Sequence, residues 1–155
     1  MSTLIELIFK GQVVKVDFSF LERYFGNSTN IVLNFPEKEI SSYEEVVGLL
    51  KADNYVNIVI NDTILEVYSK IVKNVFVDIT VDSGFIDLLY FFDYKDVGII
   101  AFQDVMNILR KWSMEHRDYY NFEYIICQSD NGGADEYYFD NEKFGPLFFV
   151  NNDLS

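Results

Sequence analysis

The chain has 155 residues, of which 50% are hydrophobic and 17% aromatic, and its formal net charge is −13. The apolar content is sufficient for a packed core and excludes intrinsic disorder. The negative charge excludes direct binding to nucleic-acid phosphates and to anionic membrane surfaces, and it favours a basic protein partner. Solubility alone is the competing interpretation of this charge.

The length is typical of one domain, and the sequence contains no repeat, low-complexity tract or linker. We therefore expect a single compact acidic domain over residues 1–150, followed by a short polar tail over 151–155. The amino-terminal stretch lacks the basic region of a signal peptide, and charges interrupt the longest apolar runs. These features predict a cytoplasmic protein without a membrane span.

The amino-terminal third has the alternation of apolar and polar residues that is typical of strands. Lys10-Gly11 is predicted to join the first two strands as a hairpin, and Pro36 to end the third. Residues 21–25 are ambiguous, and Gly26-Asn27-Ser28 is predicted to be a turn. The expected strands cover 4–9, 12–20 and 30–35.

Ser42 and Glu45 have the spacing of a capping box, which predicts a helix over 43–52. A strand is predicted over 55–60. Asn61-Asp62 then has the chemistry of a helix cap, with Ile64, Val67, Tyr68 and Ile71 at helical spacing behind it. We predict a second helix here, because Ser69-Lys70 continues its period. The competing interpretation is a hairpin, because residues 63–68 are also rich in β-branched and aromatic types.

The central block is predicted to nucleate the core. Residues 75–81 alternate with period two, Asp82-Ser83-Gly84 has turn chemistry, and the nearly all-apolar stretch 85–94 suits a central strand covered on both faces. From Ile99 the period becomes helical. The expected helix ends near His116–Asp118, with its apolar face formed by Phe102, Val105, Met106, Leu109 and Trp112.

Further strands are predicted over 122–127, 136–139 and 147–150, as a terminal antiparallel pair or triplet. Strands and helices do not alternate regularly along the chain. We therefore predict an α+β fold with a mainly antiparallel β-sheet and about three α-helices packed against it.

The residues that usually carry catalysis are scarce. His116 is the only histidine, lies in the charged stretch MEHRD and is expected to be solvated, whereas Cys127 is expected to be a buried small hydrophobe. Asp87 must reach an edge, water or a partner such as Arg110. The segment SDNGGADE has glycine where a calcium loop needs an oxygen ligand. No metal or cofactor is expected.

Residues 118–142 hold seven acids and no lysine or arginine, interleaved with tyrosine and phenylalanine. Tyrosines supply contact area and carboxylates pair with basic groups, which predicts a binding surface for a basic protein. The alternative is a half-buried sheet with tyrosines inward and acids outward. The candidate partner-binding residues are Asp130, Asp135, Glu136, Tyr137, Tyr138, Asp140 and Glu142.

Small size, acidity and the lack of a catalytic set predict a non-catalytic inhibitor. In these general features, though in no shared motif, the chain is similar to the immunity proteins of bacterial toxin systems. Our hypothesis is an immunity-type protein that neutralises a basic toxin such as a nuclease. The alternatives are an adaptor, a nucleic-acid-mimicking regulatory protein of phage or anti-defence type, and a carboxylate-dependent hydrolase.

Overall fold

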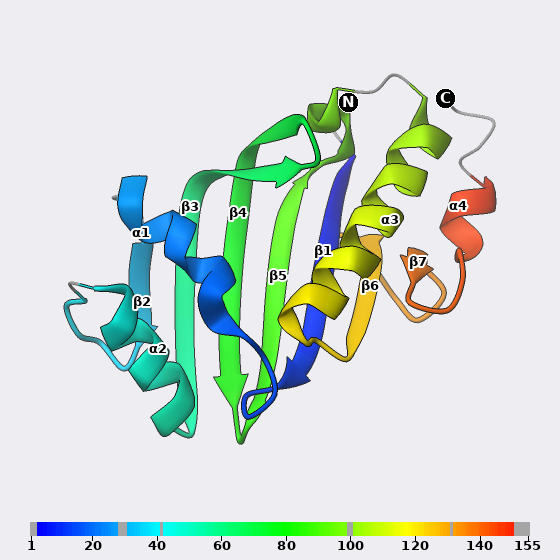
Figure 1. Ribbon diagram of the computed structural model, residues 1–155. Helices are drawn as coiled ribbons and strands as arrows, with labels where there is room; N and C mark the ends of the chain where they lie inside the picture. Colours follow the sequence, from blue (N-terminus) through cyan, green and yellow to red (C-terminus); the bar gives the residue numbers. More distant parts are fainter. Residues whose placement is uncertain (1–2, 28–30, 41, 99–100, 131, 151–155) are drawn as a thin grey trace.

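The computed structural model describes the chain except residues 1–2, 28–30, 41, 99–100, 131 and 151–155 (Figure 1). The predicted tail and the first two residues of the stretch predicted as the long helix, Ile99 and Ile100, therefore lie outside the described residues. The strands are β1 (Leu4–Gln12), β2 (Ile31–Phe35), β3 (Tyr55–Val67), β4 (Lys70–Asp82), β5 (Phe85–Asp93), β6 (Tyr124–Ser129) and β7 (Tyr137–Asp140). The helices are η1 (Phe18–Leu21), α1 (Glu22–Asn27), α2 (Tyr43–Ala52), η2 (Tyr94–Val97), α3 (Phe102–Tyr120) and α4 (Pro146–Val150).

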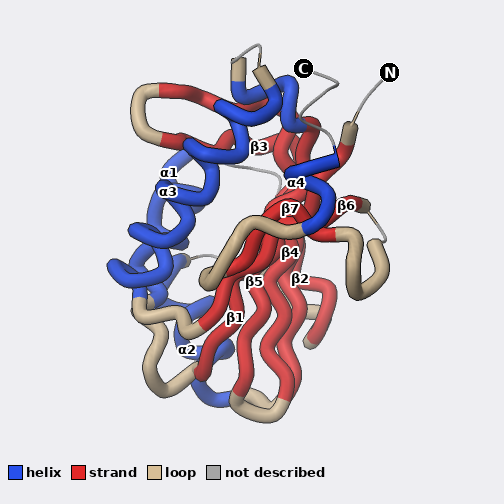
Figure 2. The backbone as a smooth tube through the Cα atoms, turned by 90° about the vertical axis from the view of Figure 1, so that its right-hand side faces the viewer, coloured by secondary structure: helices blue, strands red, loops and turns tan. Residues whose placement is uncertain are grey.

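All seven described strands belong to one antiparallel sheet, in the order β2-β3-β4-β5-β1-β6-β7. Helices α1, α2 and α3 lie against one face of this sheet, as Figures 1 and 2 show. The predicted α+β fold with an antiparallel sheet is confirmed, with four α-helices in the described part of the chain where about three were expected.

The core lies between the sheet and these helices. In β4, alternate residues from Val75 to Val81 are at most 1% exposed, as the period of two predicts. The adjoining face of α3 buries the five apolar residues that the helical spacing identified. Apolar burial of this extent is the main favourable term in folding.

The turn between β4 and β5 has the predicted chemistry. Ser83 and Gly84 both have positive φ, at 53° and 85°, as tight hairpin turns require. The prediction that β5 is covered on both faces is wrong. Asp87 is exposed and Leu89 half-buried, because no described helix lies against the second face of the sheet (Figure 2).

The predicted strand over 12–20, and with it the first hairpin, is wrong. Strand β1 pairs with β5 and β6 instead, and the chain after it turns into η1. The Asp17 carboxylate accepts a hydrogen bond from the Ser19 backbone N–H at 2.9 Å and begins this helix. The alternation of apolar residues predicts that Val14 is buried on the same face as Phe18 and Phe20. Val14 is instead 88% exposed, whereas both phenylalanines are buried.

Residues 21–27 also differ from the sequence interpretation. The ambiguous segment enters α1 at Glu22, and Gly26-Asn27 continue this helix rather than form a turn. Ser28 lies outside the described residues. Strand β2 ends before Pro36, as predicted, and begins at Ile31, because Asn30, the predicted first residue, lies outside the described residues.

The helix predicted after Asn61-Asp62 is wrong, and the competing hairpin is confirmed. Strand β3 continues to Val67 and pairs with β4, with register shifts between Ile60 and Leu65. Positive φ at Asp62 (50°) and Asn74 (59°) bends the two strands where the register shifts. Figure 1 shows the end of this hairpin reaching over the sheet toward α3.

The capping box at α2 is confirmed in its first half, because the Ser42 hydroxyl accepts from the Glu45 N–H at 3.2 Å and the helix spans the predicted residues.

The strand predicted over 147–150 is wrong. This segment forms α4, which begins at Pro146. Phe148 packs its ring 4.1 Å from that of Phe144, and β7 instead pairs with β6.

Candidate partner-binding surfaces

The candidate residues of the carboxyl-terminal segment divide into two groups. The carboxylates of Asp130, Asp135, Glu136 and Glu142 are exposed. Tyr138 is 4% exposed and packs 5.5 Å from the Phe102 ring, so that its side chain belongs to the core. Burial raises the pKa of the Tyr138 hydroxyl to about 12.

Tyr137 and Asp140 are half-buried and shape the chain around β7. The Asp140 carboxylate accepts from the N–H groups of Glu142 and Lys143 at 2.8 and 2.9 Å. The Tyr137 ring occupies the space beside Gly145, where a Cβ would lie 2.5 Å from it. These contacts fix the turn that presents Glu142 to solvent.

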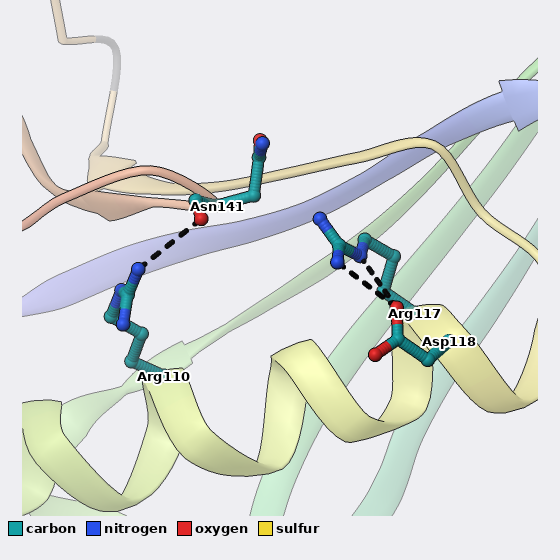
Figure 3. Close-up of polar contacts among 4 residues, drawn as sticks. All are labelled: Arg110, Arg117, Asp118 and Asn141. Carbon is teal, nitrogen blue, oxygen red and sulfur yellow. Dashed lines mark hydrogen bonds and ion pairs between the residues drawn. The ribbon is translucent and has the colours of Figure 1, made fainter.

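This segment is attached to α3 through Arg110. Its guanidinium donates to the carbonyl oxygens of Asp140 and Asn141 at 3.1 and 3.2 Å, the latter bond being drawn in Figure 3. The same group lies 5.3 Å from the centre of the Phe144 ring. Arg110 is therefore not the partner of Asp87 that the sequence suggests, and Asp87 instead reaches solvent.

Two turns further along α3, Arg117 forms an ion pair of 3.0 Å with the neighbouring Asp118 (Figure 3). The Asp118 side chain is 69% exposed, so this pair contributes little to stability. Asp118 thus belongs to the acidic segment by sequence but has its charge partly compensated.

The second face of the sheet forms another surface. Three apolar residues lie side by side on neighbouring strands, namely Ile126, Ile8 and Leu89. Lys10 of β1 lies opposite Asp87 of β5 in the strand register. A depression of about 220 Å³ lies between β1, β4 and β5. This face therefore combines a short apolar stripe with charged side chains.

A larger pocket, of about 390 Å³, lies on the helix side of the sheet. The end of the β3–β4 hairpin forms one wall, the carboxyl-terminal half of α3 another, and α1 the third. We call it the hairpin pocket. Its lining residues are Arg23, Glu66, Tyr68, Trp112, Glu115, His116, Tyr119 and Tyr120.

The expectation that His116 is solvated is wrong. Its ring stacks on Trp112 at 4.6 Å and lies 5.0 Å from the Phe9 ring, and its buried Nε2 has no described hydrogen-bond partner. Burial, with a smaller contribution from the charge of Arg23, lowers the pKa of His116 to about 3. The imidazole is therefore neutral at pH 7.

Sequence reasoning did not find the hairpin pocket. The spacing of Trp112, His116 and Tyr120 at i, i+4 and i+8 would have identified an aromatic stripe on a helix. No local pattern connects this stripe with Glu66 and Tyr68, because the spacing of their segment predicts a separate helix.

Other groups considered from the sequence are also located. Cys127 is buried as predicted, and burial raises the pKa of its thiol. The described residues include no group of three or more His, Cys, Asp or Glu side chains that could hold a metal ion. No helix in the described part of the chain is long and apolar enough to cross a membrane.

Comparison with known proteins gives one informative result. No family model and no curated protein sequence matches the chain. The fold is similar to that of one chain in the crystal structure of the toxic C-terminal tip of CdiA from Pseudomonas aeruginosa in complex with immune protein. The match has a TM-score of 0.67 and 19% sequence identity, and it covers 95% of this chain and 99% of that chain. At this identity the likeness establishes a shared fold.

Proposed function

We propose that this protein is an immunity-type inhibitor, which binds a basic bacterial protein toxin in the cytoplasm and blocks it without catalysing a reaction. The observation that carries the proposal is the fold shared, over nearly the full length of both chains, with a member of a toxin–immune protein complex. We therefore propose that the binding partner of this chain is a protein toxin.

Two properties of this chain favour the role of the immune protein over that of the toxin. Its net charge of −13 attracts a cationic partner and raises the rate of encounter. Its single histidine stacks on Trp112 and has a pKa lowered by burial, and its single cysteine is completely buried. Neither group is poised for acid–base or nucleophilic chemistry.

For the toxin-contacting surface we propose the exposed acids of the carboxyl-terminal segment. Asp130, Asp135, Glu136 and Glu142 lie on the loop before β7 and on the turn after it, and the hydrogen bonds of Asp140 and Arg110 hold that turn in place. Carboxylates on fixed turns lose little side-chain freedom when they pair with arginine or lysine. Tyr137 supplies half-buried contact area beside them.

The test is co-expression with any toxin domain that is encoded next to this gene. We expect the protein to restore growth of cells that produce that domain, and the purified proteins to form a stable complex. Failure of both results would contradict the proposal. Growth arrest by this chain alone would identify it instead as a toxin.

The contact surface is tested separately with the Asp130→Asn/Asp135→Asn double variant. Loss of two interfacial carboxylates is expected to weaken binding about tenfold. The matched control is Glu37→Gln/Glu39→Gln, which removes two exposed charges from the loop between β2 and α2. Equal loss of affinity in both variants would show that overall charge, and not this segment, determines binding.

A further inference from the structure

The hairpin pocket contains none of the seven candidate partner-binding residues, although Tyr119 and Tyr120 of segment 118–142 line it, and its walls are mainly aromatic. The His116 ring lies 4.6 Å from both Trp112 and Tyr120, and Tyr119 and Tyr120 are 4.7 Å apart. Tyr119 is 73% exposed and Tyr68 48% exposed, although both side chains are large. Aromatic faces gathered around an open space favour a planar or cationic group.

The polar groups of the pocket are consistent with a cation. Glu66 and Glu115 line it, and the Tyr68 hydroxyl donates to the Glu115 carboxylate at 2.5 Å. The Lys111 ammonium already lies 5.9 Å from the centre of the Tyr68 ring. Because His116 is neutral, it adds no positive charge to the lining.

Arg23 is the cation of the lining. It is exposed on α1, and no carboxylate among the described residues lies within ion-pair distance of its guanidinium. The lining itself holds two carboxylates and one guanidinium and is therefore negative by one charge, whereas the Lys111 ammonium lies beside Tyr68 but is not part of the lining. An exposed arginine side chain can turn toward solvent when a second cation enters, since it has many rotamers.

We propose that the hairpin pocket receives an arginine side chain of the protein partner. The planar guanidinium would stack on the exposed ring of Tyr119 while its N–H groups donate to Glu66 and Glu115. Arginine combines such stacking with paired donation to carboxylates, which the compact ammonium of lysine does not. That the arginine belongs to a toxin rests on the function proposed above.

The chain contains its own reporter for this test, because Trp112 is its only tryptophan and lines the pocket. The probe is the tripeptide acetyl-Gly-Arg-Gly-amide, titrated at physiological ionic strength while Trp112 fluorescence is recorded. We expect a saturable change with this probe and none with acetyl-Gly-Glu-Gly-amide.

Variants then identify the groups that bind the probe. Glu66→Gln/Glu115→Gln should weaken its affinity about tenfold, because two ion pairs are lost while glutamine still accepts from Tyr68. Glu37→Gln/Glu39→Gln removes the same charge elsewhere and should leave the affinity unchanged. Arg23→Gln should strengthen binding, because it removes a like charge from the lining.

The proposal is overturned if the arginine probe gives no saturable change, or if the pocket and control variants behave alike. Binding of the glutamate probe that is abolished by Arg23→Gln would assign the pocket to an acidic side chain instead. The assay uses no toxin, so that its failure would leave the proposed immunity function standing. Failure of growth rescue would likewise leave a demonstrated arginine site without a known partner.

Discussion

His116 shows how one residue takes its properties from distant neighbours. In the sequence it stands among charged residues, which predicts a solvated ring. In the structure its neighbours along the helix, Trp112 and Tyr120, and Phe9 of β1 enclose the ring. Burial would remove the hydration of an imidazolium there, and its Nε2 has no described hydrogen-bond partner, which together with the charge of Arg23 explains the low pKa.

The stability of the protein should therefore fall as the pH is lowered through the range below about 6.5, the pKa of an unfolded histidine. Between that value and the folded pKa of about 3, the unfolded state binds more protons than the folded state. The free energy of unfolding then decreases with falling pH by at most about 1.4 kcal/mol per pH unit. Urea unfolding at about pH 7 and about pH 5.5 measures the effect.

His116→Phe keeps an aromatic ring in this site and removes the titrating group. Its free energy of unfolding should change less between the two pH values, because most carboxylates stay ionised in both. An equal loss of stability in the variant and the natural protein would show that another group carries the pH dependence.

At the scale of elements, the chain uses close approaches that only glycine allows. Gly145 stands between β7 and α4, and a Cβ there would lie 2.5 Å from the ring and the carbonyl oxygen of Tyr137. Gly48 in α2 has no other heavy atom within 4 Å of the same position. The two glycines thus have opposite structural requirements.

We expect Gly145→Ala to lower the free energy of unfolding by about 2 kcal/mol, because the Tyr137 backbone must shift. Gly48→Ala should raise it by about 0.5 kcal/mol or more, because alanine is a better helix former than glycine. Urea denaturation of both variants provides the measurement. A neutral Gly145→Ala would mean that α4 packs less tightly on β7 than the contacts indicate.

The whole molecule combines a sheet covered on one face with a strongly negative surface. The helices and the bent β3–β4 hairpin cover one side of the sheet, whereas the other side carries the apolar stripe of Ile126, Ile8 and Leu89. With a net charge of −13, the field extends beyond any single contact surface. It should therefore act on the rate of encounter more than on the lifetime of a complex.

Association with the proposed basic partner should slow about tenfold between low and physiological ionic strength, because salt screens the attraction. The dissociation rate should change much less. Stopped-flow measurements across a salt series provide the test. An association rate that is independent of salt would show that the negative charge serves solubility alone.

Local patterns in the sequence correctly predicted those elements whose determinants are close in the chain. Ser42 with Glu45 predicted α2, the alternation over 75–81 and the turn at Ser83-Gly84 predicted the β4–β5 hairpin, and the apolar spacing from Phe102 predicted α3. Each depends on hydrogen bonds or periodicity within a few residues. Together they were sufficient to predict the α+β class.

The tertiary structure decided where short segments had two acceptable conformations. Residues 61–71 fit both the helical spacing and the composition of a strand. They form part of a hairpin because this arrangement buries Leu65, Val67 and Val72. The hairpin then brings Glu66 and Tyr68 to α3, and the packing of α3 on β1 half-buries His116 among aromatic rings. Burial depends on contacts between residues far apart in the chain, which no local pattern contains. The sequence by itself thus determined the fold class and the charge, whereas tertiary packing created the hairpin pocket.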